Sequence, residues 1–469
     1  MDGSSFPFIC FRKMCPKAQG LERLQMGGKE EQDRNKREER RKRRFRNQII
    51  AYIVSAAAVM ALAAGIVFGA GYLMEESRKA KQKEEESQQE KQDKIEEIFA
   101  PEEEIVMTPE PVPEVVEPTR EEKLEAIVNA GIEGMTLENK VAGLFIVTPE
   151  AITGVSTAVQ AGEGTREALG QYAVGGLIYF QKNIQSEEQI REMLNNTALY
   201  ANYPVFLAVD EEGGSVARVA SAGIGPQVGS AEEIGATGDV QNAYNAGAAI
   251  GARLTELGFN LDFAPAADLA NVEGSIMKGR SYGADAPSVA GFVTSMMAGL
   301  EEQNVTACLK HFPGIGSATE DPHDGMSSTD RSAEQLWAEE LTVFQAGIDA
   351  GARMIMVGHV AAPSLTGDNE PSLFSRVLVT DILREQMGFK GVIITDALAM
   401  SAISQYYGSD EAAIMAILAG CDMLLMPEDF EKAYNGVLQA VRDGVISEER
   451  VNDSLRRIYR IKYDDMVEQ

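Results

Sequence analysis

The chain has 469 residues, of which 44% are hydrophobic, and a formal net charge of −29. This length and composition allow a large buried core and one to three domains. A chain this acidic repels phosphate backbones, which argues against a nucleic acid partner. Its four cysteines form no convincing disulfide framework or zinc pattern, and no metal or organic cofactor is indicated. Cys308 and Cys421 lie inside apolar runs, where cysteines are usually buried.

A transmembrane helix is predicted near the amino terminus. Residues 1–48 form a basic leader that ends in REERRKRRFRN, and residues 49–74 carry no charge. That run is roughly 39 Å long as a helix, enough to cross a hydrocarbon layer of ~30 Å, whereas buried helices and cleaved signal peptides are shorter. Because Lys and Arg stay on the cytoplasmic side, we expect a single-pass protein of the cell membrane with its amino terminus inside. Gly65 and Gly69 form a G-x-x-x-G pattern that would allow a weak homodimer.

The segment that follows is predicted to be a stalk. Residues 75–98 consist almost entirely of Glu, Lys, Gln and Ser, which is typical of a solvated helix or a disordered chain. Residues 101–118 contain five prolines, which block helix and sheet and favour an extended tether. We therefore assign residues 75–119 to a disordered stalk and residues 120–469 to a folded extracytoplasmic domain.

Short apolar runs alternate with amphipathic stretches throughout this domain. The runs are VAGLFIV (141–147), GGLIYF (175–180), VFLAV (205–209), NLDFAP (260–265), TACLKH (306–311), RMIMVGH (353–359), GVIIT (391–395) and DMLLMP (422–427). Segments such as SEEQIREMLNNTALYA and SAEQLWAEELTVFQAGIDAG between them read as helices. Eight buried strands separated by helices predict an α/β fold of the (β/α)8 TIM-barrel type, with a doubly wound open sheet as the alternative. Nucleotide-binding glycine motifs are absent from the sequence, which weakens the alternative.

Charged and imidazole groups follow several of these strands. Asp210, the pair Lys310 and His311, His359 and Asp396 each stand at the carboxyl end of an apolar run. In a barrel of this type, those ends meet at the rim where active sites are assembled. Any one of these residues could be a helix cap or a satisfied core group, but their shared position predicts an active site.

The loop after the fifth run, KHFPGIGSATEDPH (310–323), contains two of the three histidines of the chain. Its glycines and prolines break regular structure and predict a loop over the barrel mouth. Asp321 and His323 point the same way if the segment is extended, so the carboxylate can fix the tautomer of the imidazole and raise its basicity. This pair is a candidate proton-transfer dyad, and Glu320 is a competing acid.

Asp396 supplies a partner for this dyad. A carboxylate near the cationic Lys310 should stay ionised and can attack an electrophilic carbon. One carboxylate nucleophile and one positioned proton donor are the minimum set for a retaining glycosidase. The sequence therefore predicts a glycosidase in which histidine replaces the usual carboxylic acid.

The domain resembles the single-domain β-N-acetylglucosaminidases of glycoside hydrolase family 3 over roughly residues 120–462. Four blocks carry the resemblance, in the order of the family: AVDEEGGSVAR (208–218), MKGRSYG (277–283), KHFPGIGSATEDPH (310–323) and GVIITDALAM (391–400). The resemblance implies a barrel of the family's N-terminal type.

The resemblance also implies the roles of individual residues. Asp396 matches the catalytic nucleophile, His323 the general acid/base and Asp321 its carboxylate partner. The positions that hold the hydroxyls of N-acetylglucosamine are matched by Asp210, Arg218, Arg280, Lys310 and His311, and we add His359 as a further substrate-binding candidate.

The chain departs from the family pattern at Ile315, Pro322 and Ala397, none of which removes a catalytic group.

The implied activity is exo-hydrolysis of terminal β-linked N-acetylglucosamine from amino-sugar glycans such as peptidoglycan fragments. Two alternatives stay open from the sequence. One is phosphorolysis, since a histidine acid/base repels an anionic acceptor less than a carboxylate would. The other is a catalytically silent, membrane-tethered protein that binds glycan.

Overall fold

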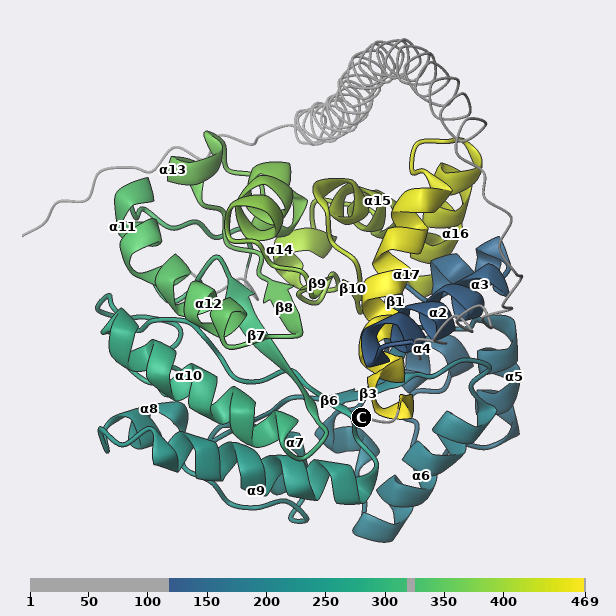
Figure 1. Cartoon of the computed structure of the whole chain (residues 1–469), viewed down its shortest axis with the longest axis horizontal. Coiled ribbons are helices and arrows are strands. Elements are labelled where there is room, and N and C mark those ends of the chain that lie inside the picture. The colour runs from purple at the N-terminus through teal and green to yellow at the C-terminus, as the bar shows by residue number, and fades with distance from the viewer. Residues whose placement is uncertain (1–117, 319–324, 468–469) are drawn as a thin grey trace, which may run out of the picture. The chain divides into compact units, whose positions relative to one another are not determined.

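The computed structural model describes residues 118–318 and 325–467 of the chain (Figure 1). The predicted leader, the predicted transmembrane helix and nearly all of the predicted stalk lie outside these ranges. Within them, none of the helices combines the length and apolar character that crossing a membrane requires. The transmembrane helix at 49–74 therefore stays a prediction.

Eight parallel strands form one sheet in the order β10–β1–β2–β3–β6–β7–β8–β9. These are β1 (Phe145–Val147), β2 (Gly176–Ile178), β3 (Phe206–Val209), β6 (Leu261–Asp262), β7 (Thr306–Phe312), β8 (Met354–Val357), β9 (Val392–Thr395) and β10 (Leu424–Leu425). A parallel bridge between Ile394 and Met423 joins β9 to the residue before β10, which brings the two ends of the sheet together. The predicted barrel is confirmed, and the open-sheet alternative does not fit this closure.

Helices surround the strands on the outside (Figure 1). The longer ones are α2 (Arg120–Glu133), α5 (Glu163–Gln171), α6 (Glu187–Tyr200), α9 (Gln241–Leu257), α10 (Ala286–Glu301), α12 (Glu340–Asp349), the π-helix η3 (Val377–Gln386), α15 (Ser409–Ala419), α16 (Phe430–Arg442) and α17 (Glu448–Tyr463). The helices α16 and α17 pack beside α2 and α3, so the first and last described segments of the barrel meet.

Short elements fill the connections. They are α3 (Leu137–Ala142), α4 (Pro149–Thr153), η1 (Gln181–Asn183), β4 (Glu211–Gly213), β5 (Val216–Ala217), α7 (Arg218–Ser221), α8 (Ala231–Gly235), α11 (Ala333–Ala338), α13 (Pro363–Thr366), η2 (Ser372–Phe374), α14 (Ser401–Ser404) and η4 (Asp464–Met466). The segment 332–351, predicted as one helix, forms α11 and α12, which are separated at Glu339.

The strands are buried because their side chains face apolar layers on both sides. Every residue of β3 and of β9 is buried, as the continuous apolar runs FLAV and VIIT predict. The helices add one buried face each, for example through Ile190 and Leu194 of α6. Cys308 and Cys421 are buried free thiols in this core, as expected from their apolar surroundings.

Candidate active site

A tight hairpin follows β3 and shapes one side of the rim. Asp210 directly follows the strand, and β4 and β5 then pair antiparallel. Gly213 and Gly214 form the turn with φ values of 91° and 56°, a backbone region that glycine enters without steric cost. The hairpin returns Arg218 to the strand end: its backbone N–H donates to the carbonyl of Asp210 at 3.2 Å, and its Nη2 lies 4.0 Å from Oδ2 of Asp210.

Lys310, near the end of β7, is the centre of a buried charge cluster. Its Nζ donates to Oδ1 of Asp210 at 2.8 Å and lies 2.6 Å from Oε1 of Glu212. Nε and Nη2 of Arg280 donate to the two oxygens of Glu212 at 2.9 and 2.7 Å. Two cations and two anions therefore balance one another, and the bidentate pair holds its geometry tightly.

The pKa values in this cluster follow from its charges. Burial raises the pKa of Glu212, but Lys310 and Arg280 outweigh burial and lower it to about 2. Burial lowers the pKa of Lys310, but Asp210 and Glu212 outweigh burial and raise it above its ordinary value. Lys310, Arg280 and Glu212 therefore stay charged at neutral pH, which keeps the ammonium group fixed beside Asp210.

His311 is held by Asp268, an acid in the loop after β6. Oδ2 of Asp268 lies 2.8 Å from Nδ1 of His311 and 3.1 Å from its backbone nitrogen. Oδ1 accepts the backbone N–H of Ile315 at 2.7 Å. A carboxylate at Nδ1 favours the tautomer with the proton there, which leaves Nε2 as the second polar atom of the ring. Asp268 thus orients His311 and fixes the start of the following loop.

Asp396 stands directly after β9 with a carboxylate that solvent can reach. Its side chain is 16% exposed, and Oδ1 accepts the backbone N–H of Ala397 at 2.7 Å. Nε2 of His359, at the end of β8, lies 3.7 Å from Oδ2. Burial raises the pKa of Asp396, but His359, His311, the backbone N–H of Ala397 and Lys310 together outweigh burial and hold it below its ordinary value. The carboxylate is therefore ionised at neutral pH.

The structure brings together most of the residues that the sequence predicted. Asp210, Arg218, Arg280 and Lys310 form or adjoin the charge cluster, whereas His311 and His359 both lower the pKa of Asp396. The expected influence of Lys310 on Asp396 is present, but it is smaller than that of the two histidines.

The predicted dyad of Asp321 and His323 lies in residues 319–324, outside the described residues, as do Glu320 and Pro322. Before this segment, Ile315 is buried in a small apolar cluster made of Ala266, Met277, Ile315, Ala318 and Val360. Ile315 therefore packs against other apolar groups at the rim.

Two acids of the site carried no assigned role in the sequence analysis. Glu212 lies inside the block AVDEEGGSVAR, so its position two residues after Asp210 was the available signal. Asp268 follows β6, a strand for which no polar rim residue was named. The pairing of each acid depends on contacts between separate strands, which spacing along the chain does not reveal.

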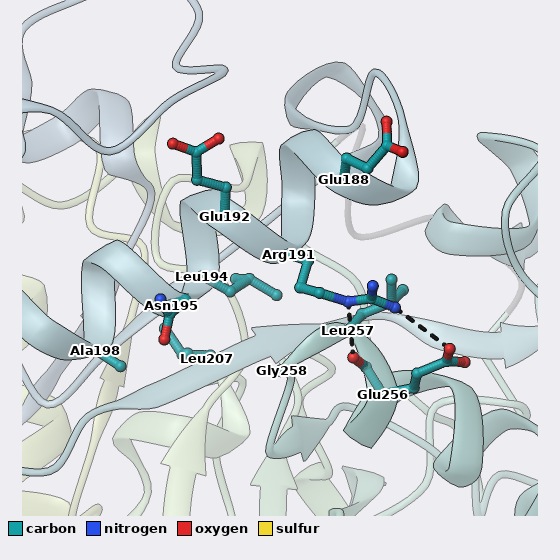
Figure 2. Close-up of a pocket in the computed structure, with 10 residues that line it drawn as sticks. All are labelled: Glu188, Arg191, Glu192, Leu194, Asn195, Ala198, Leu207, Glu256, Leu257 and Gly258. Atoms are coloured by element: carbon teal, nitrogen blue, oxygen red, sulfur yellow. Dashed lines mark hydrogen bonds and ion pairs between the residues drawn. The ribbon is translucent and has the colours of Figure 1, made fainter.

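A groove on the outer wall of the barrel is separate from this site. It lies between α6 and α9 and has a volume of about 600 Å³. Arg191 crosses the groove and donates to the backbone carbonyl of Glu256 at 3.2 Å and to its carboxylate at 3.3 Å (Figure 2). Leu207, in the first half of β3, and Gly258, before β6, line the groove, which therefore lies toward the amino ends of these strands.

The acids of the site are paired with cations and histidines. Among the described residues there is no group of three His, Cys, Asp or Glu side chains that could hold a metal ion.

A family model described as the glycosyl hydrolase family 3 N terminal domain matches residues 136–461. The chain belongs to glycosyl hydrolase family 3. The match covers every strand of the barrel and all the rim residues described above, so the charge cluster and Asp396 lie within the family domain.

Several family 3 relatives are similar to this chain. A β-hexosaminidase A from Pseudoalteromonas piscicida is 30% identical over 326 residues, which are 63% of this chain and 54% of that protein. A β-hexosaminidase from Chromobacterium violaceum is 32% identical over 275 residues, 58% of this chain and 76% of that protein. The structure of a family 3 β-N-acetylglucosaminidase from Paenibacillus sp. str. FPU-7 superposes with a TM-score of 0.65 at 33% identity, covering 71% of this chain and 63% of that one. The chain thus spans about half the length of the Pseudoalteromonas protein.

Proposed function

We propose that this family 3 protein is a retaining exo-β-N-acetylglucosaminidase. It removes terminal β-linked N-acetylglucosamine from amino-sugar glycans such as peptidoglycan fragments. The names of the relatives, β-hexosaminidase and β-N-acetylglucosaminidase, support N-acetylglucosamine as the sugar. One observation supports a carboxylate nucleophile. The carboxylate of Asp396 is ionised, reachable by solvent and located at the strand-end rim.

Asp396 is the proposed nucleophile. Its carboxylate attacks the anomeric carbon of the bound sugar and forms a covalent glycosyl-enzyme, which water then hydrolyses with net retention. The lowered pKa supports this role because an attacking carboxylate must be ionised. The hydrogen bond from the N–H of Ala397 orients one carboxylate oxygen and leaves Oδ2 facing His359.

His323 is the proposed proton donor to the leaving group, with Asp321 as its carboxylate partner. This assignment rests on the D-P-H sequence and on the resemblance of the loop motif. In the second step the same imidazole takes the proton from the attacking water.

The charge cluster is the proposed holder of the sugar hydroxyls. Asp210 and Lys310 offer a charged acceptor and a charged donor at one point of the rim, and Arg218 adds a second donor 4.0 Å from Asp210. His311 presents Nε2 once Asp268 has occupied Nδ1. Arg280 already gives two N–H groups to Glu212, so we assign it to ordering Lys310 as well as to binding the sugar.

The activity is tested with the full-length protein and p-nitrophenyl N-acetyl-β-D-glucosaminide. Release of p-nitrophenol is expected, with β-N-acetylglucosamine as the first-formed product by NMR. A folded protein that releases none contradicts the proposal. Added phosphate separates the alternative reaction, because formation of N-acetylglucosamine 1-phosphate would identify a phosphorylase.

We also propose that residues 49–74 anchor the chain in the cell membrane, with the amino terminus in the cytoplasm and the barrel outside. The uncharged run and its basic flank support this location. The full-length protein should stay in the membrane fraction after alkaline carbonate extraction, whereas deletion of residues 49–74 should release it. A full-length protein that carbonate extracts contradicts the anchor.

A further inference from the structure

Glu211 is a buried acid beside the site that the proposed mechanism does not use. Its Oε2 accepts the backbone N–H of Val219 at 2.6 Å, and its Oε1 accepts that of Ala220 at 2.9 Å. Both N–H groups belong to the first turn of α7, where no carbonyl of the helix itself is available to them. One carboxylate therefore fixes this turn through two hydrogen bonds.

The turn that Glu211 fixes begins with Arg218, a proposed sugar-binding residue. The backbone N–H of Arg218 donates to the carbonyl of Asp210, and its guanidinium lies over the ring of Phe180 at 5.7 Å. The position of the guanidinium thus depends on the backbone on both sides of it. A rotation of α7 would move Arg218 away from Asp210.

Asp262, at the end of β6, holds the backbone of Glu211 through a hydrogen bond. Its Oδ1 accepts the backbone N–H of Glu211 at 2.9 Å, and within the described part of the chain its Oδ2 has no hydrogen-bond partner. Burial, followed by the nearby carboxylate of Glu211, raises the pKa of Asp262 well above its ordinary value. Burial therefore favours the neutral form of Asp262, which supports Glu211 through the hydrogen bond to its backbone N–H.

The groups around Glu211 set when it ionises. The charged groups that face it or its neighbours are Arg218 on α7, Asp210 after β3, Asp262 on β6, Lys310 on β7, Glu212 and Arg280. On η1, which packs against α7, Lys182 pairs with Glu150 at 3.4 Å. Burial is the largest effect and raises the pKa of Glu211 to about 7, although the two N–H groups and Arg218 oppose it. Glu211 therefore gains or loses its proton near neutral pH.

We propose that Glu211 is a positioning residue whose ionised carboxylate clamps α7 and holds Arg218 at the sugar, so that its protonation weakens substrate binding. A protonated carboxyl group can accept only one of the two N–H groups well, because its other oxygen carries a hydrogen. Because folding raises the pKa of Glu211, the folded state holds this proton more tightly than the unfolded state does. The free energy of unfolding therefore falls as the pH rises from 4.5 to about 7. Acidification through pH 7 therefore weakens the hold of Glu211 on α7, whereas protonation of Glu211 does not lower the free energy of unfolding.

The first test measures the pH dependence of KM with the full-length protein, and it rests on the proposed glycosidase function. Between pH 8 and pH 6, KM should rise about tenfold, the order of one lost charged hydrogen bond. In Glu211→Gln, KM should be high at both pH values and the dependence should disappear. A flat KM in the wild type, or an unchanged dependence in Glu211→Gln, overturns the proposal.

Glu301→Gln is the matched control. Glu301 ends α10 at the opposite end of β7, and burial raises its pKa to about 7 as well. Its removal deletes a buried acid of the same pKa without touching the hairpin or Arg218. The KM profile of Glu301→Gln should therefore follow the wild type, and loss of the profile in this variant overturns the assignment to Glu211.

A second readout needs no turnover. Amide hydrogen exchange in peptides covering Arg218–Ser221, corrected for the intrinsic pH dependence of exchange, should show less protection at pH 6 than at pH 8. Protection should be low at both pH values in Glu211→Gln and normal in Glu301→Gln. Protection in the wild type that is the same at pH 6 and pH 8 contradicts the proposed role of Glu211. Absence of turnover would refute the proposed function, whereas calorimetric binding of N-acetylglucosamine at the two pH values would still test the effect on the sugar.

Discussion

Nε2 of His359 lies 3.7 Å from Oδ2 of Asp396. The two residues follow β8 and β9, which pair in parallel up to Val357 and Thr395. The register of these strands therefore brings an imidazole to the carboxylate that we propose as nucleophile. This contact is one reason why a largely buried acid stays ionised.

Asp396→Asn should lower kcat by roughly 10³-fold or more, because an amide of the same shape cannot form the glycosyl ester. The rate of p-nitrophenol release from the N-acetyl-β-D-glucosaminide measures this. Asp381→Asn, on the exposed pair with Arg376, is the control and should retain full activity. A kcat in Asp396→Asn within tenfold of the wild type would assign the nucleophile elsewhere.

His359→Gln should move the acid limb of the kcat/KM profile to higher pH. The charge of His359 lowers the pKa of Asp396, so its removal raises that pKa, and the nucleophile becomes protonated at a higher pH. The profile extended from pH 6 to below pH 4, under the change that Glu211 is expected to cause near pH 7, measures the shift. An acid limb that stays in place or moves to lower pH would show that His359 does not keep Asp396 ionised.

Lys310→Met should lower the free energy of unfolding by about 3 kcal/mol, because it leaves the buried Glu212 and the half-buried Asp210 without their shared cation. Urea denaturation measures this loss, and KM should rise as well. Lys140→Met is the matched control, since among the described residues Lys140 forms its ion pair with the exposed Glu448 alone, and this variant should lose about 1 kcal/mol or less. Equal losses in the two variants would contradict the central role of Lys310.

His323→Ala should affect a sugar leaving group far more than an aryl one. The value of kcat/KM for the β-1,4-linked disaccharide of N-acetylglucosamine should fall by roughly 10²- to 10⁴-fold, whereas p-nitrophenol leaves with little need of a proton. Glu320→Gln tests the competing acid. If that variant shows the difference between leaving groups and His323→Ala does not, the proton donor is Glu320.

The barrel was predictable because each buried strand is a continuous apolar run. Boundaries were less accurate: Val141 and Ala142 of the first run belong to α3, since apolar character alone does not separate the end of a buried helix from the start of a buried strand. The break between α11 and α12 at Glu339 also left no signal in a continuous helical pattern.

The strand-end residues were predictable for a similar reason, because the carboxyl ends of parallel strands share one rim. Their partners were not. Asp268 reaches His311 from the neighbouring strand connection, and Glu212 reaches Lys310 and Arg280 from the first strand of the glycine hairpin. Such pairs depend on the three-dimensional path of loops, for which the sequence gives spacing but not direction.

The proposed glycosyl ester on Asp396 can be observed directly. The full-length protein is incubated with a 5-fluoro β-N-acetylglucosaminide that carries a good leaving group, since the fluorine slows breakdown of the ester. Mass spectrometry of the peptides should then find one added N-acetyl-5-fluoroglucosaminyl group on Asp396 and none in Asp396→Asn. Turnover with no adduct, or an adduct on a different carboxylate, would contradict the assignment of Asp396 as the nucleophile.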